Sequence, residues 1–292
     1  MTEVTRAPDS LYERLEPLLA AVAKPIQYIG GEVNSVRKDW GAVEVRWALM
    51  YPDAYAVGAP NQGLAILYEV LNERDWILAE RSYSVWPDLA AAMRAHGVPQ
   101  FTLENHRPVA AFDVLGVSLS TELGYTNLLA ALDLAGLPLH ASDRTDSDPI
   151  VIAGGHCSFN PEPVADFVDA VVLGDGEEAV LEVSEIVRAW KADGRPGGRL
   201  GVLERLAQGT CYVPAFFDVA YAADGGIASV RPNRGVPARV EKHTLHDLDR
   251  WPYPKAPLVP LAETVHERYS VEIFRGCTRG CRFCQAGMIT RP

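Results

Sequence analysis

Expected strands and helices alternate from residue 43 to residue 190, and no other feature of the sequence constrains the fold as strongly. The strands are expected at 43–50, 77–83, 112–119, 149–153 and 170–173, and the helices at 63–71, 87–96, 125–135 and 177–190. This alternation indicates an α/β fold with a doubly wound parallel sheet. Ligands on such sheets bind beyond the carboxyl ends of the strands. Right-handed crossovers keep these ends on one edge, so one edge is expected to carry Asp53, Ser118, Gly154 and Gly174.

The segments on either side of this region differ from it. The other expected elements are a helix at 9–23, a surface loop at 191–201, short strands within 209–230, a proline-rich extended linker at 231–260 and a strand at 270–274. The sequence therefore predicts four parts: an amino-terminal segment at 1–42, the α/β domain at 43–200, small strands and a linker at 201–262, and a further domain that begins at 263–292.

The composition is that of a globular protein, with 48% hydrophobic and 22% charged residues among 292. No membrane span is expected, because no run of about 18 apolar residues occurs. A net charge of −11 argues against broad electrostatic binding of nucleic acid. The apolar stretch at 15–23 contains Glu16 and follows Arg14, which favours an amphipathic helix over a secretory signal. A cytoplasmic location is therefore expected.

Three cysteines lie close together near the carboxyl end, in the pattern Cys-x3-Cys-x2-Cys: Cys277, Cys281 and Cys284. Cysteine thiolates ligate iron–sulfur clusters. Three on one loop can hold three irons of a four-iron cluster and leave the fourth iron open to another ligand. Gly276 and Gly280 allow the tight backbone path that such a loop needs. Four arginines make the segment basic, which favours thiolate over thiol: Arg275, Arg279, Arg282 and Arg291.

A structural zinc site is the alternative at these cysteines. Tetrahedral zinc sites use four ligands, often in two Cys-x2–4-Cys pairs, whereas this segment has one triplet and no fourth ligand close by. Cys157 and Cys211 are distant in sequence and are not expected to bind the cluster. His243 and His246 lie in the expected linker, and two ligands do not make a metal site. A disulfide framework is not expected without a secretory signal.

The cysteine loop, with Phe283 before its last cysteine, resembles the signature loop of the radical S-adenosylmethionine (radical SAM) enzymes. The resemblance implies a [4Fe-4S] cluster whose open iron chelates S-adenosylmethionine, with Phe283 beside the adenine. It also implies electron donation from the cluster, which cleaves S-adenosylmethionine to methionine and a 5′-deoxyadenosyl radical that abstracts hydrogen from a substrate. The implied partner is an electron donor of flavodoxin or ferredoxin type. The substrate stays unknown, because the residues that would contact it lie on strands beyond this sequence.

Motifs at the strand ends resemble the cobalamin-binding domain that precedes the cluster domain in many radical SAM enzymes. They are Asp53-Ala54-Tyr55-Ala56-Val57-Gly58, Ser118-Leu119-Ser120-Thr121 and Gly154-Gly155-His156-Cys157. The resemblance implies a Rossmann-type fold that binds cobalamin through Asp53, Tyr55, Gly58, Ser118, Thr121, Gly154, Gly155 and Gly174. Taken alone, Gly154-Gly155 is equally compatible with a tight turn.

Tyr55 stands where cobalamin enzymes with the motif Asp-x-His-x-x-Gly have a histidine that ligates cobalt. A phenol with a pKa of about 10 is a poor neutral ligand. Any bound cobalamin is therefore expected to lack a protein histidine on its lower face. His156 follows a different strand, and its position is more typical of a hydrogen-bonded loop histidine than of a ligand.

The segment Gly174-Asp175-Gly176-Glu177-Glu178 follows a strand and opens a helix, as a dinucleotide-binding loop does. It follows the last strand instead of the first, and its three carboxylates would repel a pyrophosphate. It is similar to the acidic helix-opening turn of cobalamin-type radical SAM proteins. In that interpretation the acids favour the helix dipole and need not touch a ligand.

The resemblance extends from about residue 43 to residue 292. In this family the cysteine loop follows the first strand of a partial β/α barrel, which needs on the order of 150–200 further residues. The chain is therefore expected to be the amino-terminal part of a radical SAM enzyme, and to be inactive alone. The alternative is a non-catalytic module that binds a ligand or partner and contains a structural zinc or iron–sulfur site.

Overall fold

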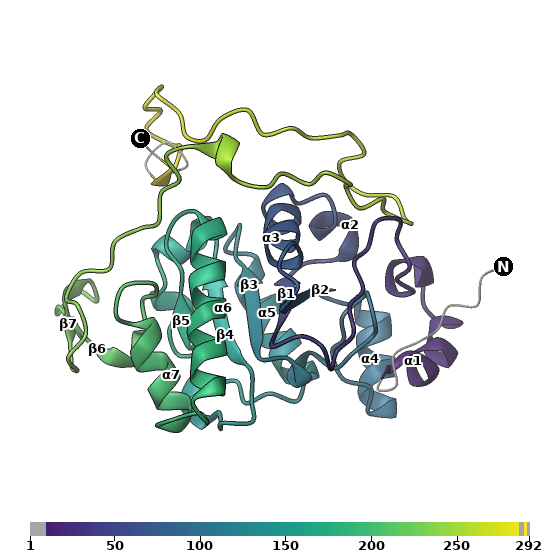
Figure 1. The fold of residues 1–292 in the computed structure, drawn as a ribbon, viewed down its shortest axis with the longest axis horizontal. Helices are drawn as coiled ribbons and strands as arrows, with labels where there is room; N and C mark the ends of the chain where they lie inside the picture. The colour runs from purple at the N-terminus through teal and green to yellow at the C-terminus, as the bar shows by residue number, and fades with distance from the viewer. Residues whose placement is uncertain (1–9, 286–288, 291–292) are drawn as a thin grey trace.

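A five-stranded parallel sheet forms the centre of the protein (Figure 1). The computed structural model describes residues 10–285 and 289–290. The strands are β1 (Val45–Tyr51), β2 (Ile77–Tyr83), β3 (Val114–Ser118), β4 (Ile150–Gly154) and β5 (Ala170–Val171). They lie in the order β2-β1-β3-β4-β5, and every neighbouring pair is parallel. The prediction of a doubly wound parallel sheet is confirmed.

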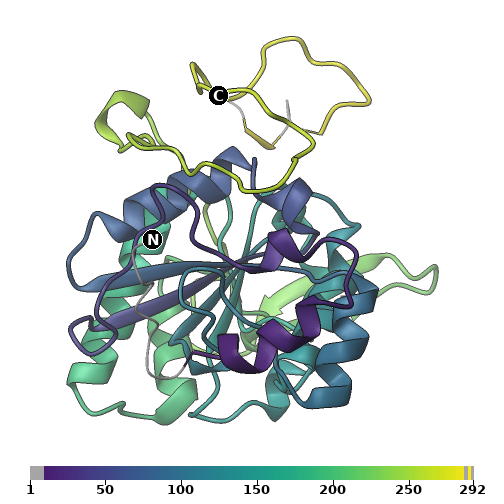
Figure 2. The same cartoon turned by 90° about the vertical axis from the view of Figure 1, so that its right-hand side faces the viewer.

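Helices cover both faces of this sheet, so most residues of its strands are apolar, as expected of a buried parallel sheet (Figure 2). The edge strand β2 is the exception, because it buries Glu80, Arg81 and Ser82. Trp47 and Leu49 belong to a core cluster that includes side chains of α3 (Gln62–Asn72), α6 (Gly176–Ala192) and α7 (Gly198–Leu206). Ala48 and Met50, which point the opposite way, pack in a second cluster with α5 (Gly124–Leu134).

The remaining helical elements are short. They are α1 (Tyr12–Leu19), α2 (Tyr55–Gly58), α4 (Pro87–His96) and the 3-10 turns η1 (Pro25–Tyr28), η2 (Val109–Ala111), η3 (Ala141–Asp143), η4 (His156–Phe159), η5 (Glu162–Val164), η6 (Pro214–Phe216) and η7 (Leu248–Arg250). The helix expected at 9–23 corresponds to α1, and its predicted first residue, Asp9, lies outside the described residues. Among the described residues, no helix combines the length and the apolar character needed to cross a membrane.

The structure contains a helix, α7, where the sequence predicted mainly a surface loop. By sequence, Gly197 and Gly198 predict an interruption of helical structure, and both have a positive φ, of 72° and 58°. The helix begins within this turn, at Gly198. Arg199 stabilises its start, because its buried guanidinium forms an ion pair of 2.6 Å with Asp169. Leu206 on the same helix is fully buried. Tertiary contacts thus outweigh a local breaker signal.

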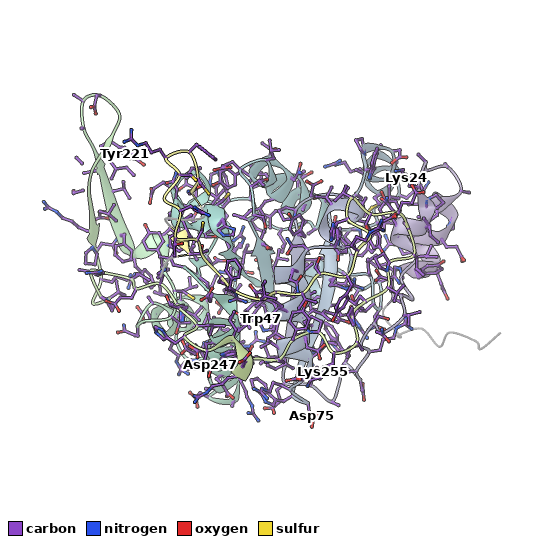
Figure 3. All side chains as sticks on the ribbon, turned by 90° about the horizontal axis from the view of Figure 1, so that it is seen from above. Lys24, Trp47, Asp75, Tyr221, Asp247 and Lys255 are labelled. Carbon is purple, nitrogen blue, oxygen red and sulfur yellow. The ribbon has the colours of Figure 1, made fainter. Side chains whose placement is uncertain are left out.

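The short strands expected after residue 209 form a hairpin of β6 (Phe217–Tyr221) and β7 (Ile227–Pro232). It projects from the body of the protein, with Tyr221 on it (Figure 3). The expected strand at 270–274 does not form, and these residues have no regular secondary structure. A strand needs a neighbour that accepts and donates its backbone hydrogen bonds, and no described strand pairs with this segment.

The expected linker crosses the carboxyl-terminal edge of the sheet as a strap (Figures 1 and 2). We use the word strap for residues 236–262. Its prolines favour an extended path, and side chains of the α/β domain hold it at several points. The hydroxyl of Tyr253 accepts a 2.6 Å hydrogen bond from Gln62, Lys255 forms an ion pair of 2.5 Å with Glu73, and Val259 bridges to Val33. The strap is therefore a packed part of the structure.

Candidate functional site

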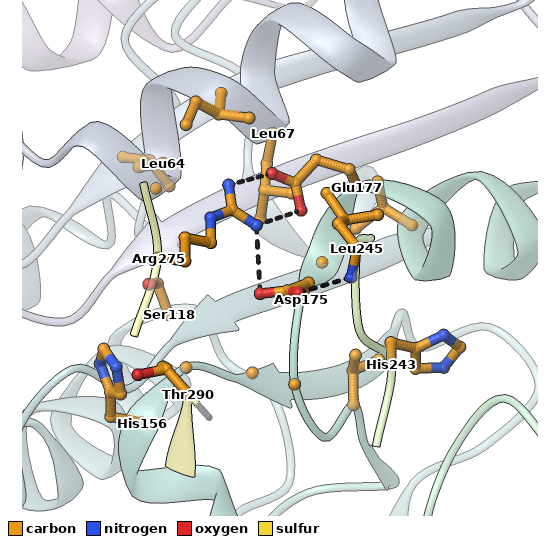
Figure 4. Close-up of a pocket in the computed structure, with 18 of the residues that line it drawn as sticks. Leu64, Leu67, Ser118, His156, Asp175, Glu177, His243, Leu245, Arg275 and Thr290 are labelled. Carbon is orange, nitrogen blue, oxygen red and sulfur yellow. Dashed lines mark hydrogen bonds and ion pairs between the residues drawn. The ribbon is translucent and has the colours of Figure 1, made fainter. Parts of the chain in front are cut away.

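A cavity of about 490 Å³ opens at the carboxyl-terminal edge of the sheet (Figure 4). Residues from the middle of β1 and from the ends of β3 and β4 line it, together with side chains of α3 and α6. In the strand order β2-β1-β3-β4-β5, the chain direction across the sheet reverses between β1 and β3. Open α/β sheets bind ligands at this switch point. The cavity therefore lies where the topology places a ligand site.

The floor of the cavity is apolar. Trp47, Leu49, Ile152 and Val172 contribute to it from the sheet, and Leu64 and Leu67 do so from α3. The indole N–H of Trp47 donates a 2.9 Å hydrogen bond to the hydroxyl of Ser184 on α6, which satisfies the one polar atom of this side chain. The floor is thus suited to the apolar part of a ligand.

Four predicted site residues line the cavity: Ser118, Gly154, Gly155 and Gly174. Gly154 faces open space, since a Cβ there would meet no heavy atom within 4 Å. Gly155 has a φ of +100°, and a Cβ there would lie 2.7 Å from the carbonyl oxygen of Leu119. The rim therefore combines an open backbone surface at Gly154 with a turn that excludes side chains at Gly155. Asp53 follows β1 at the same edge, so the shared-edge prediction is confirmed.

The other predicted residues, Asp53, Tyr55, Gly58 and Thr121, are not among those that line the cavity. The carboxylate of Asp53 accepts a 2.7 Å hydrogen bond from the N–H of Ala54, so it stabilises the turn before α2. Gly58 is needed for packing, because a Cβ there would lie 2.5 Å from the ring of Tyr83.

Tyr55 is buried beneath the strap, with 2% of its surface exposed. Its hydroxyl donates a 2.6 Å hydrogen bond to Oε1 of Glu32 and accepts one of 3.2 Å from the N–H of Leu261. Burial, followed by the charge of Glu32, raises the pKa of Tyr55 well above its ordinary value. Glu32 in turn forms a buried ion pair with Arg81. Both sides of the phenol oxygen are therefore engaged by protein, which does not fit a role in ligating cobalt.

The acidic turn at the start of α6 contacts segments that follow it by 70 residues or more. Asp175 accepts a 2.7 Å hydrogen bond from the N–H of Leu245 in the strap and forms an ion pair of 3.1 Å with Arg275. Glu177 also pairs with Arg275, whose Nη1 and Nη2 donate to its two carboxylate oxygens (Figure 4). The sequence assigned these acids to the helix dipole and missed the contacts. The only local signal was the concentration of carboxylates beside an arginine-rich loop.

No third ligand from residues 10–285 or 289–290 joins His243 and His246 in a metal site. A ring nitrogen of His243 lies 3.0 Å from the carbonyl oxygen of Thr210. In the part of the chain that the structure describes, no group of three or more His, Cys, Asp and Glu side chains is arranged to hold a metal ion. His156 lines the cavity, and its side chain is exposed.

The cysteine loop is exposed and has the backbone that its glycines predict. Gly276 and Gly280 have φ of +86° and +71°. The N–H of Arg279 donates to Sγ of Cys277 at 3.5 Å, and the N–H of Cys284 donates to the carbonyl of Cys281 at 3.1 Å. The donor set and the turns suit a thiolate-bound group, although the three thiols do not converge into a metal-holding set here.

One of the four arginines expected to make this segment basic is engaged away from the thiols. Arg275 is engaged by three carboxylates, so its charge is not directed at the thiols. Phe283 is 93% exposed, and Arg291 lies outside the described residues.

Cys157 and Cys211 are buried in the α/β domain, apart from the exposed Cys277 and Cys281. Burial raises the pKa of Cys211, and burial together with the nearby carboxylate of Glu122 raises that of Cys157. Neither thiol therefore has the exposed, electropositive surroundings that activate a cysteine.

The fold and the cavity define an α/β protein with a cavity at one edge of its sheet, to which a three-cysteine loop is attached. The sequence model of a family described as radical SAM proteins, N-terminal, matches residues 63–214, which is just over half of the chain. The chain therefore belongs to the N-terminal regions of radical SAM proteins.

Other comparisons add less. No curated protein matches the chain. A similar solved structure is that of the radical S-adenosylmethionine methyltransferase TsrM from Kitasatospora setae, with a tryptophan substrate and the SAM analogue aza-SAM bound. The two chains are 13% identical, and the match has a TM-score of 0.35. It covers 62% of this chain and 29% of the methyltransferase chain, so this chain spans less than a third of that protein. Similarity at this level supports no conclusion about ligands or activity.

Proposed function

We propose that this chain is the amino-terminal part of a radical SAM enzyme. The observation that carries the proposal is the position of the residues before the first cysteine. Phe274, Arg275 and Gly276 line the same cavity as the sheet edge, and Cys277 follows directly. A group held by the loop would therefore lie next to a ligand held at the edge. Family membership supports the same conclusion, because it was found on residues 63–214, which exclude the loop.

Cys277, Cys281 and Cys284 would hold a [4Fe-4S] cluster. When bound, this cluster supplies the electron that cleaves S-adenosylmethionine reductively, and the protein contributes binding, orientation and shielding. The exposure of the loop means that further protein is required to exclude water around it. We therefore propose that the chain alone is inactive. An electron donor of flavodoxin or ferredoxin type would serve the full-length protein.

The cavity is our candidate site for cobalamin. Its volume of about 490 Å³ lies in the range of about 300–1,000 Å³ that holds drug-sized ligands, so it would enclose only part of a molecule as large as cobalamin. Gly154 offers an open backbone surface beside it. The apolar floor suits a flat, apolar part of a large cofactor. Tyr55 would support the fold beneath the strap and would take no part in ligation.

The test is anaerobic reconstitution of a full-length protein with iron and sulfide. We expect the brown visible absorption of a four-iron cluster and, with a reductant and S-adenosylmethionine, formation of methionine and 5′-deoxyadenosine. A colourless protein that contains stoichiometric zinc would contradict the proposal and support the non-catalytic alternative. A coloured protein that never cleaves S-adenosylmethionine would support a structural cluster.

A further inference from the structure

Arg275 lies two residues before Cys277 and connects this segment to the start of α6. Its Nε lies 2.7 Å from Oε1 of Glu272 on its own segment, and its Nη1 lies 3.1 Å from Oδ1 of Asp175. The same guanidinium donates from Nη1 and Nη2 to the two carboxylate oxygens of Glu177 (Figure 4). Bidentate pairing of this kind fixes direction as well as distance.

The burial of Glu177 makes its ion pair with Arg275 important for the energy of this arrangement. It is 3% exposed, and it lies in the first turn of α6, beside the cavity. Removing the cationic partner of a buried carboxylate is unfavourable, because the charge is left without compensation. Glu177 therefore favours the arrangement in which Arg275 is present. A lysine would supply charge without the planar fork that reaches several carboxylates at once.

The same turn also holds the strap. Asp175 accepts from the N–H of Leu245 with its second oxygen, and the N–H of Asp175 donates a 3.0 Å hydrogen bond to the carbonyl of His243. One rigid element, the junction of β5 and α6, thus fixes both segments that approach the cavity from the carboxyl-terminal part of the chain.

We propose that Arg275 is a positioning residue that seats the cysteine loop over the cavity by pairing with Glu177 and Asp175. Cys277 lies two residues further on, so its Cα is within about 7 Å of the Cα of Arg275. Fixing the guanidinium therefore fixes the first thiol relative to the sheet edge. The inference rests on the proposed function in one respect, namely that the group being positioned is a cluster.

Limited proteolysis of the full-length protein tests, without any cluster, whether Arg275 seats the loop. In Arg275→Ala we expect trypsin to cleave after the exposed Arg279 and Arg282 roughly 10-fold faster or more, given the size of a buried ion pair, with a smaller effect in Arg275→Lys. The matched control is Arg188→Gln, which breaks the bidentate pair of Arg188 with Glu44 elsewhere on α6. Its cleavage rate after Arg279 and Arg282 should equal that of the parent. Equal rates in Arg275→Ala and the parent would overturn the proposal.

The position of the cluster provides a second, independent measurement. A spin label on Ala189→Cys, an exposed position of α6, allows its distance from the reduced paramagnetic cluster to be measured. We expect a narrow distribution in the parent and in Arg188→Gln, and a broad one in Arg275→Ala. Unchanged distributions would overturn the positioning role. A parent without a paramagnetic cluster would instead count against the proposed function, and the rates of limited proteolysis would still decide whether Arg275 seats the loop.

Discussion

Gly174 and His243 lie so close together that a Cβ on Gly174 would be 2.1 Å from the carbonyl oxygen of His243. The two residues form an isolated parallel bridge, and the N–H of His243 donates a 2.8 Å hydrogen bond to the carbonyl of Leu173. The strap thus extends the sheet beyond β5 for a single residue pair. Gly174 permits this because it lacks a side chain and has a φ of +93°.

Gly174→Ala should therefore displace the strap from the edge of β5. We expect faster hydrogen exchange at residues 243–245, and a loss of about 1–3 kcal/mol in the free energy of unfolding from backbone strain alone. Gly225→Ala is the matched control, because Gly225 also has a positive φ, of 84°, but meets no heavy atom within 4 Å. It should lose stability through strain and leave 243–245 unchanged. Unaltered exchange at 243–245 in Gly174→Ala would refute the collision.

Tyr55→Phe should destabilise the protein. The change removes a hydroxyl that donates to buried Glu32 and accepts from Leu261, so one carboxylate oxygen and one N–H lose a partner. We expect a loss of about 1–3 kcal/mol in the free energy of unfolding, measured with denaturant. Tyr221→Phe, at an exposed position of the hairpin, should change it by less than about 0.5 kcal/mol. Equal effects in the two variants would contradict the buried role of Tyr55.

Glu80 should make stability depend on pH. Burial, and then the charge of Glu104, raises the pKa of this carboxyl from about 4.5 to about 7, although Asn105, Thr102 and Arg107 oppose the shift. The folded protein therefore holds the proton more tightly than the unfolded chain. The contribution is complete below pH 4.5 and is lost as the pH rises to about 7, a change of about 3 kcal/mol.

Glu80→Gln is the test of this pH dependence. Its free energy of unfolding, compared with that of the parent by denaturation between pH 4.5 and pH 8, should fall less as the pH rises. The amide oxygen can still accept from Asn105, and the amide NH2 can donate to the hydroxyl of Thr102, which in the parent donates to the other carboxylate oxygen. Parallel curves for the two proteins would show that Glu80 does not titrate in this range.

Single cysteine variants of the full-length protein should divide into two groups after reconstitution. Cys277→Ala, Cys281→Ala and Cys284→Ala should each lose most of the bound iron, because each removes one ligand of the loop. Cys157→Ala and Cys211→Ala should keep it, since both thiols are buried in the α/β domain. Iron analysis per polypeptide is the measurement. Iron loss in Cys157→Ala equal to that in the first group would show that the ligand assignment is wrong.

Any cobalamin bound by this protein should lack nitrogen ligation on its lower face. Tyr55 is engaged with Glu32, and His156, which lines the cavity, follows a different strand from the motif that carries the usual histidine. Electron paramagnetic resonance of the reduced, cobalamin-loaded protein should show no splitting of the cobalt signal by nitrogen, and His156→Ala should leave the spectrum unchanged. Nitrogen splitting that disappears in His156→Ala would overturn the prediction and identify His156 as the ligand.

Local pattern was sufficient for the sheet. The boundaries of β2 and α4 agree with their predicted ranges, because each is an apolar or amphipathic run with clear ends, such as Pro87 at the start of α4 and Gly97 after it. The shared edge of the strand ends also followed, since parallel strands with right-handed crossovers leave few alternatives. The cysteine loop could be found because its chemistry depends on residues within eight positions.

Only the tertiary structure decided what the strand-end residues touch. Tyr55 meets Leu261 across 206 residues, and Arg275 meets Glu177 across 98. Periodicity describes which face of an element is apolar, and it contains no information about which distant segment covers that face. By its place in a motif, Tyr55 was therefore expected to lie at a cobalamin site. In the structure its hydroxyl is buried beneath the strap. From the sequence, the acidic turn of α6 was assigned only an interaction with the helix dipole. In the structure it also binds residues 243–245 of the strap and Arg275.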